Sequence, residues 1–327
     1  MRILVTGSAG FIGSHLCSAL LVQGHQVMGL DAYREDAWPA HEASAAASLA
    51  YRKNSLLKGI NVAKLDMLDR AKLRALIQTE KPDCIIHLAG LALVTTTDKT
   101  PEVGAADILL STIHVLEAIR LAPCVKRFVY ISSSMVYGNF GGEEVDETAT
   151  PRPINMYGGL KLAGEAVTKA YLATTATEHV IVRPIAAYGP GDVNRRVIQI
   201  FCQDSLAGKP VTVNISADNR IDFTYIEDLA LGLSKCCVLP QAAGETFNMS
   251  FGKARNLTEV VEIIAQHVPD IRVIEKKVDD PSRPRRGTLS IAKAQQLLGY
   301  QPGVNLEAGI ARYISHLRSL QPASVSA

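Results

Sequence analysis

Residues 2–13 read RILVTGSAGFIG, and this stretch decides the fold. An apolar strand-like run comes first, a helical pattern follows, and three glycines spaced GxxGxxG lie between them. Gly7 permits a tight turn, and Gly10 lets a phosphate approach the backbone. Gly13 lets the helix pack closely on the strand. A strand, a glycine turn and a helix N-terminus in this order predict a pyrophosphate-binding site.

Apolar strand-like runs alternate with helical stretches over the first half of the chain. This alternation predicts an α/β fold, a doubly wound parallel Rossmann sheet with helices on both faces. The expected strands are 2–5, 26–30, 61–65, 84–88, 128–132 and 180–183. The expected helices are 11–23, 70–79, 105–120 and 156–174.

Asp31 closes the second expected strand. An acidic residue there accepts hydrogen bonds from the adenosine ribose hydroxyls of a dinucleotide, and its charge repels a 2′-phosphate. The position therefore favours NAD over NADP as the cofactor. A plain turn residue is the alternative interpretation of Asp31.

The rhythm of the sequence changes after residue 183, where a turn cluster and shorter elements follow. We predict an NAD-binding domain over 1–185, to which the chain returns at about 222–250. Residues 186–327 should form a smaller C-terminal α/β domain that mostly binds substrate. We expect the Ala/Ser-rich residues 33–58 to be an irregular or partly helical surface insertion, and the tail from residue 321 to be frayed.

Tyr157 and Lys161 lie one helical turn apart in the expected helix 156–174, so they face the same side. A tyrosine with its ordinary pKa of about 10 is a poor base at neutral pH. A neighbouring ammonium group favours the phenolate form. The spacing therefore predicts a tyrosine base assisted by a lysine, although a surface tyrosine and lysine at this spacing also arise by chance.

Further motifs follow in a fixed order: His87-Leu-Ala-Gly90, Ser132-Ser-Ser-Met-Val-Tyr-Gly138, Tyr157-Gly-Gly-Leu-Lys161, Arg183-Pro-Ile-Ala-Ala-Tyr-Gly-Pro-Gly191 and Leu298-Gly-Tyr-Gln-Pro302. With the glycine turn and Asp31, they resemble the extended short-chain dehydrogenases/reductases, the NAD-dependent epimerase/dehydratase family. This group includes nucleotide-sugar epimerases and dehydratases. The resemblance covers nearly the whole chain.

The resemblance implies catalytic roles for Ser133, Tyr157 and Lys161, with Ser133 holding the substrate oxygen. It also implies that Lys161 contacts the nicotinamide ribose, and that residues 66–67 lie near the adenine. For Asp66, a charge that favours the start of a helix is an alternative. The residues expected to bind NAD are Gly7, Gly10, Phe11, Ile12, Gly13, Asp31, Asp66, Met67, Leu88, Ala89, Gly90, Tyr157 and Lys161.

The expected reaction follows from what the chain lacks after its catalytic serine. The family's dehydratases have an Asp and a Glu there, and this chain has Ser134 and Met135. We therefore expect a nucleotide-sugar epimerase, in particular a UDP-sugar 4-epimerase that works through a transient 4-keto intermediate. The alternatives are an NAD-dependent dehydrogenase or reductase of a sugar or hydroxysteroid-like secondary alcohol, and a non-catalytic NAD-binding protein.

Recognition of a diphosphate needs cations in the C-terminal half of the chain. The residues expected to bind substrate are Ser133, Ser134, Arg195, Arg220 and Arg286, and Arg196 is a further candidate. Arg220 lies one residue earlier than the family's phosphate-binding arginine, and a side chain one residue out of register in a strand points to the other face. A solvated surface arginine is its alternative. The sequence also departs from the family at Ile108, Ala186 and Ser290.

Composition limits the other classes of function. The 327 residues are 47% hydrophobic with a formal net charge of only +2, so we expect no nucleic-acid partner. The six cysteines and eight histidines form no metal-binding pattern. We find no signal peptide and no apolar run of membrane-spanning length, and we expect a cytoplasmic protein. By resemblance, the helices 105–120 and 156–174 would form a homodimer interface.

Overall fold

The computed structural model describes residues 1–33, 43–91, 93–140, 142, 144–214, 220–276 and 284–320, with the side chains of residues 43 and 44 excepted. In this part of the chain, seven strands form one parallel sheet in the order β11-β6-β5-β4-β1-β2-β3. The strands are β1 Arg2–Thr6, β2 Gln26–Asp31, β3 Asn61–Lys64, β4 Cys84–His87, β5 Arg127–Ile131, β6 Glu178–Pro184 and β11 Thr246–Met249. The predicted doubly wound sheet is confirmed.

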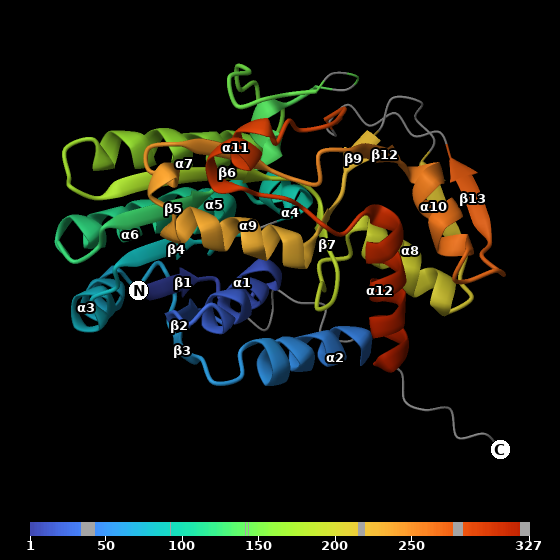
Figure 1. Ribbon diagram of the computed structural model, residues 1–327, viewed down its shortest axis with the longest axis horizontal. Coiled ribbons are helices and arrows are strands. Elements are labelled where there is room, and N and C mark those ends of the chain that lie inside the picture. Colours follow the sequence, from blue (N-terminus) through green and yellow to red (C-terminus); the bar gives the residue numbers. More distant parts are fainter. Residues whose placement is uncertain are drawn as a thin grey trace.

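Helices cover both faces of this sheet (Figure 1). One face packs against α1 Phe11–Val22, α9 Ile226–Val238 and α11 Ala292–Leu298. The other packs against α3 Arg70–Glu80, α6 Ser111–Arg120 and α7 Met156–Leu172. The strands are apolar on both sides: in β1, Ile3 and Val5 join the first core and Leu4 joins the second. The order of the strands reverses between β1 and β4, and ligands of such sheets bind at the carboxyl ends beside this point.

The predicted helix 105–120 is helical throughout in the structure, but its winding changes along its length. It is preceded by α4 Val94–Lys99 and α5 Pro101–Gly104, and its first part is the π-helix η3 Ala105–Leu110. The hydroxyls of Ser111 and Thr112 donate to the carbonyls of Asp107 and Ile108, at 2.5 and 2.6 Å. These side-chain bonds compete for carbonyls that a regular helix pairs with its own backbone.

The predicted insertion is partly helical, with α2 Ala43–Tyr51 and the π-helix η2 Arg52–Leu56. It is not purely a surface feature, because Arg52 is 1% exposed. Its guanidinium donates to the carbonyl of Gly191 at 2.6 Å and to that of Ala9 at 3.1 Å. Residues 34–42 of the predicted insertion, and the predicted frayed tail 321–327, lie outside the described residues.

The C-terminal elements pack around an apolar core of their own, separate from the two cores of the sheet, at the right of Figure 1. They are β7 Ala187–Tyr188, α8 Val197–Leu206, β8 Val211–Asn214, β9 Arg220–Asp222, β10 Thr224–Tyr225, β12 Ala254–Asn256, α10 Leu257–Ala265, β13 Val273–Lys276 and α12 Leu306–Ser319. The short helix η5 Pro240–Ala242 joins α9 to β11. The division into domains at residue 185 stays a prediction. Among the described residues, no helix has the length and apolar character that a membrane span needs.

Two glycines of α7 test how closely this helix packs on the sheet. A Cβ at Gly164 would lie 2.0 Å from the hydroxyl oxygen of the buried Tyr130, whereas one at Gly159 would meet nothing within 4 Å. We expect Gly164→Ala to lower the free energy of unfolding by about 1–3 kcal/mol, because the ring has no room to move. Gly159→Ala should raise it by up to about 1 kcal/mol through helix propensity. Urea unfolding measures both, and equal effects would contradict the packing.

Candidate active site

The glycine turn between β1 and α1 is built by close backbone approach. Gly7 has φ +70°, and a Cβ on it would lie 2.8 Å from the backbone nitrogen of Ala89. A Cβ on Gly13 would lie 2.1 Å from the carbonyl oxygen of Gly7. Side chains are therefore excluded at both positions. The turn after β1 and the segment after β4, both predicted to bind the cofactor, are thus in contact.

The start of α1 offers hydrogen-bond donors to a ligand. The first bond of the helix runs from the amide of Ser14 to the carbonyl of Gly10, at 3.0 Å. The amides of Phe11, Ile12 and Gly13 precede this bond and have no acceptor within the helix. Unpaired amides at the positive end of a helix suit a phosphate. The cradle therefore fits the pyrophosphate of a dinucleotide.

Asp31 lies beside this turn at the end of β2. Its carboxylate accepts from the amide of Ala9 at 2.9 Å and from that of Tyr33 at 2.8 Å. The amide of Leu65 donates to the carbonyl of Asp31 at 2.9 Å, which brings residues 66–67 to the same edge of the sheet. There Asp66 is exposed and Met67 is buried. This places the predicted adenosine-binding residues together.

His87, the last residue of β4, is hydrogen-bonded to the end of β1 next to the turn. Its ring contacts the hydroxyls of Thr6 at 2.8 Å and Thr112 at 3.2 Å. Burial, assisted by the charge of Lys161, lowers the pKa of His87 to about 3, so the ring is neutral. Gly90 follows with φ +139°, a backbone conformation that favours glycine.

The predicted catalytic residues meet at the carboxyl end of β5. Ser133 precedes the short helix η4 Ser134–Tyr137, and its oxygen accepts from the amide of Met135 at 3.2 Å. The Ser133 hydroxyl also acts on Tyr157 of α7, because it lowers the pKa of the phenol against the effect of burial. The ammonium of Lys161 donates to the carbonyl of Ile131 at 2.8 Å and lies 5.9 Å from the centroid of the Tyr157 ring.

In the protein without ligands, burial has the largest effect on the pKa values of Tyr157 and Lys161. It raises the pKa of Tyr157, against the opposing effects of the Arg196 charge and the Ser133 hydrogen bond. It lowers the pKa of Lys161 to about 8, against the charge of Glu165. The sequence predicts that Lys161 favours the phenolate. In the structure, the charge of Arg196 also lowers the pKa of Tyr157.

The residues predicted to bind substrate differ from one another in their burial and in their contacts. Ser134 is buried beside Ser133. Arg195 is exposed with φ +50°, and its amide donates to the side chain of Gln199 at 2.8 Å. Arg286 is half-buried in a segment whose neighbour Arg285 accepts, through its carbonyl, from the amide of Phe140 at 2.8 Å.

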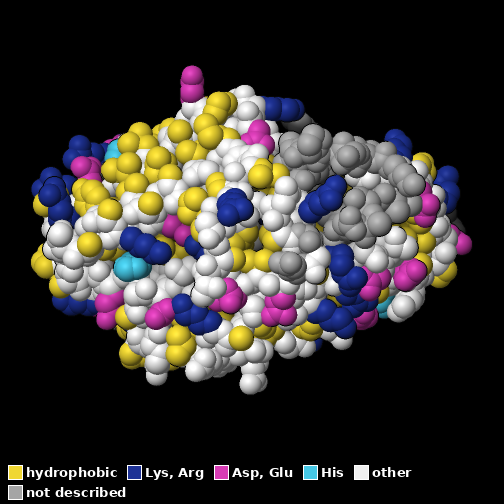
Figure 2. Space-filling model, turned by 90° about the horizontal axis from the view of Figure 1, so that it is seen from above, with side chains coloured by type: hydrophobic (Ala, Val, Ile, Leu, Met, Phe, Trp, Pro, Cys, Tyr) yellow, Lys and Arg dark blue, Asp and Glu magenta, His cyan; other side chains and the backbone are white. Residues whose placement is uncertain are grey.

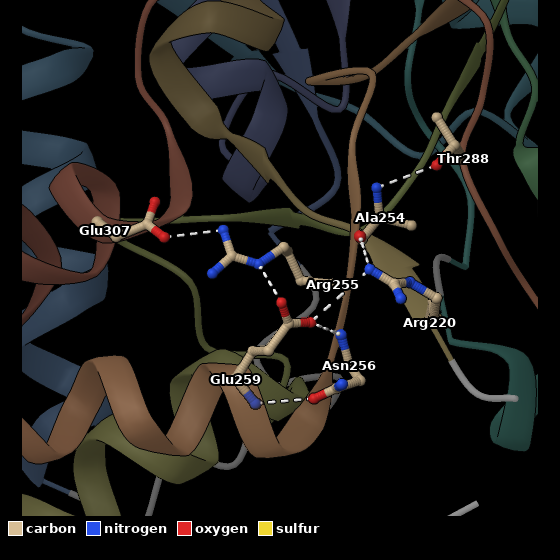
Figure 3. A network of polar contacts seen from close by, with 7 residues as sticks. All are labelled: Arg220, Ala254, Arg255, Asn256, Glu259, Thr288 and Glu307. Carbon is tan, nitrogen blue, oxygen red and sulfur yellow. Dashed lines mark hydrogen bonds and ion pairs between the residues drawn. The ribbon is translucent and has the colours of Figure 1, made fainter. Parts of the chain in front are cut away.

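Arg220 belongs to a polar cluster on β9, β12 and α10 (Figure 3). Its guanidinium donates to the carbonyl of Ala254 at 3.0 Å and lies 3.9 Å from the carboxylate of Glu259. Glu259 is also bound by Arg255 at 2.9 Å and closes a capping box with Asn256. Arg220 thus has local partners in this cluster, and its role in substrate binding stays a prediction.

Sequence reasoning overlooked the buried groups that support the site. Glu165 and Arg52 were not among the candidates, although Glu165 follows Lys161 by one helical turn and so shares its face. For Arg52 the sequence gives no such signal. In the described part of the chain, no three His, Cys, Asp or Glu side chains are grouped to hold a metal ion.

A parallel sheet with a glycine turn at its switch point, and a Ser–Tyr–Lys group beside it, define a dinucleotide-binding protein of the short-chain dehydrogenase type. The chain belongs to the NAD dependent epimerase/dehydratase family, whose model matches residues 3–250.

Known proteins resemble the chain over nearly its whole length. It is 32% identical to the uncharacterized UDP-glucose epimerase YtcB of Bacillus subtilis, covering 98% of this chain and 99% of that one. It is 31% identical to the UDP-glucose 4-epimerase of Mycolicibacterium smegmatis, with 98% and 99% covered. The crystal structure of UDP-glucuronic acid 4-epimerase from Bacillus cereus, in complex with UDP-glucuronic acid and NAD, matches with a TM-score of 0.88 and 29% identity. That match covers 98% of this chain and 100% of the other.

The position of Asp31 leads to a prediction on cofactor choice. We expect Asp31→Ala to weaken NAD binding and to narrow the preference for NAD over NADP, because the ribose acceptor and the repulsive charge are both lost. Calorimetric titration with each cofactor measures this. Asp83→Ala is a matched control, since Asp83 also accepts from a backbone amide, that of Arg2 at 2.7 Å, but at the opposite edge of the sheet. An unchanged ratio of affinities in Asp31→Ala would refute the role.

Proposed function

We propose that the chain is an NAD-dependent nucleotide-sugar epimerase, a UDP-sugar 4-epimerase with Tyr157 as its base. The observation that carries the proposal is the position of Lys161 beside the glycine cradle. Its ammonium lies 5.9 Å from the centroid of the Tyr157 ring and donates to the carbonyl of Ile131, two residues before Ser133. Relatives named as UDP-glucose and UDP-glucuronate 4-epimerases support the same reaction.

The chain's own residues provide binding, orientation and proton transfer. Ser133 holds the substrate hydroxyl in line with Tyr157, which takes its proton. Bound NAD supplies a hydride acceptor that later returns the hydride, so that the net redox change is zero. Because burial favours the neutral forms of both Tyr157 and Lys161, a positive charge in the site is needed to stabilise the phenolate. Arg196 provides part of that charge.

We propose a UDP-sugar as substrate, bound mostly by residues 186–327, with contacts from Ser133, Ser134, Arg195, Arg220 and Arg286. Ser134 and Met135 offer no carboxylic acid next to the catalytic serine, so elimination of water is disfavoured after the 4-keto intermediate forms. The keto sugar would turn in the pocket before it is reduced on its other face. A site that holds the nucleotide firmly and the sugar loosely meets this requirement.

The proposal is tested with purified enzyme and Tyr157→Phe. Wild-type protein should interconvert the 4-epimers of UDP-glucose or UDP-glucuronate without net NADH production. The variant should lose at least about 10²-fold in turnover, because the general base is gone. Chromatography of the UDP-sugars and absorbance of NADH give the two readouts. Stoichiometric NADH would favour a dehydrogenase, and full turnover in the variant would reject the base.

We also propose that the enzyme is a cytoplasmic homodimer. All six cysteines are free thiols, as is usual in a reducing compartment. Val103, Leu110 and Met156 are between 42% and 48% exposed on or beside the elements that pack with α7. Figure 2 shows hydrophobic side chains gathered at the end of the molecule where α7 lies, on the left in both views. Such a patch suits a self-complementary interface.

A charge introduced into the exposed apolar patch tests this interface. We expect wild-type protein to have the mass of a dimer in light scattering at micromolar concentration. Leu110→Glu should shift it to the mass of a monomer, because a carboxylate would be buried in the interface. Leu231→Glu is the matched control, since Leu231 is 47% exposed on α9, which covers the other face of the sheet. A monomeric wild-type protein would contradict the proposal.

A further inference from the structure

The last residues of β5 and those just after it are held by side chains of α7. The carbonyl of Ile131 accepts from the Lys161 ammonium at 2.8 Å. The hydroxyl of the next residue, Ser132, donates to the carboxylate of Glu165 at 2.5 Å. The residue after that is the catalytic Ser133, whose hydroxyl lowers the pKa of Tyr157 on the same helix. Two successive residues directly before the catalytic serine are therefore hydrogen-bonded to α7, and Glu165 accepts the second of these bonds.

Glu165 is itself fixed by a buried ion pair. Arg183 of β6 donates to its two oxygens at 2.8 and 2.6 Å, and the two side chains are only 4% and 5% exposed. A buried bidentate pair of this kind has a rigid geometry. Arg183 also donates to the hydroxyl of Tyr137 at 2.9 Å, and that hydroxyl donates to Asn248 at 2.7 Å.

The hydrogen bonds continue to the segments in front of the sheet. The side-chain amide of Asn248 donates to the carbonyls of Val145 at 3.0 Å and Ser290 at 3.2 Å. Its backbone amide donates to the carboxylate of Glu147 at 2.7 Å. Ser290 ends the segment that carries Arg286, one of the predicted substrate residues. A continuous network of hydrogen bonds thus joins Ser132, the residue before the catalytic serine, to the segment that carries Arg286.

The charge of Glu165 also affects the pKa of Lys161. The titratable groups around the Lys161 ammonium are Tyr157 and Glu165 on α7, Tyr130 on β5 and His87 on β4, with Arg183 on β6 behind Glu165. His87 is neutral, and both tyrosines have a raised pKa through burial. Glu165 is the anion that opposes the effect of burial on the lysine.

We propose that Glu165 is a positioning residue of the active site, which holds the end of β5 through Ser132 and keeps the Lys161 ammonium charged. This inference rests on the proposed function for its kinetic consequence. Its electrostatic consequence can be measured without turnover.

The test is Glu165→Gln, with two companion variants. Loss of the carboxylate leaves Arg183 as an uncompensated cation, so the pKa of Lys161 should fall by at least about one unit. Activity needs the charged lysine, so the alkaline limb of the pH profile for UDP-sugar epimerisation should move to lower pH by the same amount. NMR titration of NAD-loaded enzyme with labelled lysine side chains, assigned with Lys161→Arg, reports that pKa directly.

Ser132→Ala and the double variant E165Q/R183M separate the two roles. Ser132→Ala keeps both charges, so the pKa of Lys161 should stay at its wild-type value while turnover falls up to about tenfold through loss of the hydrogen bond to Glu165. The double variant removes a whole ion pair, which preserves folding better than breaking one, and its lysine pKa should lie between those of Glu165→Gln and wild type.

An unchanged lysine pKa in Glu165→Gln, or in the double variant if the single one does not fold, overturns the inference. Wild-type turnover in Ser132→Ala overturns the positioning part. A lysine pKa that shifts as expected in an enzyme with no epimerase activity on any UDP-sugar would reject the proposed function instead.

Discussion

The structure depends on the contact between the turn after β1 and the segment after β4, where two stretches of backbone touch with no side chain between them. At the end of β1, the chain turns so tightly that α1 starts against the carbonyl of Gly7, and the segment after β4 touches the same glycine. A single methyl group at Gly7 or Gly13 would separate these pieces. Their contact brings the positive end of α1 to the point where the strand order reverses, and the remaining site residues are arranged around that point.

Much of this arrangement could be predicted, because it is written in local patterns. The glycine spacing, the apolar strands and the one-turn spacing of Tyr157 and Lys161 each reflect contacts between near neighbours in the chain. The π-helical winding of residues 105–110 could not be predicted from apolar periodicity, since hydroxyls of Ser111 and Thr112 donate to carbonyls of this segment. Arg52 could not be predicted either, because its acceptors lie 43 and 139 residues away.

Electrostatics was the least predictable part of the site. A lysine one turn from a tyrosine suggests a depressed tyrosine pKa, but the sequence does not say how deeply both groups are buried. In the folded chain, burial raises the pKa of Tyr157 and lowers that of Lys161. The charges that oppose burial come from Arg196, just before α8, and from Glu165 in the next turn of α7. The backbone at Ala186 could not be predicted either: it has φ +40°, a left-handed conformation that glycine and asparagine adopt more readily than alanine.

The guanidinium of Arg52 has a consequence for anyone who recombines loops among related enzymes. One side chain from the insertion after β2 is bonded to the backbone of the cofactor turn and to the backbone just before α8. These three segments are therefore held together by one side chain, although they are far apart in sequence. A chimera that exchanges the insertion without its arginine would leave the carbonyls of Ala9 and Gly191 without this donor and weaken the contact between the three segments.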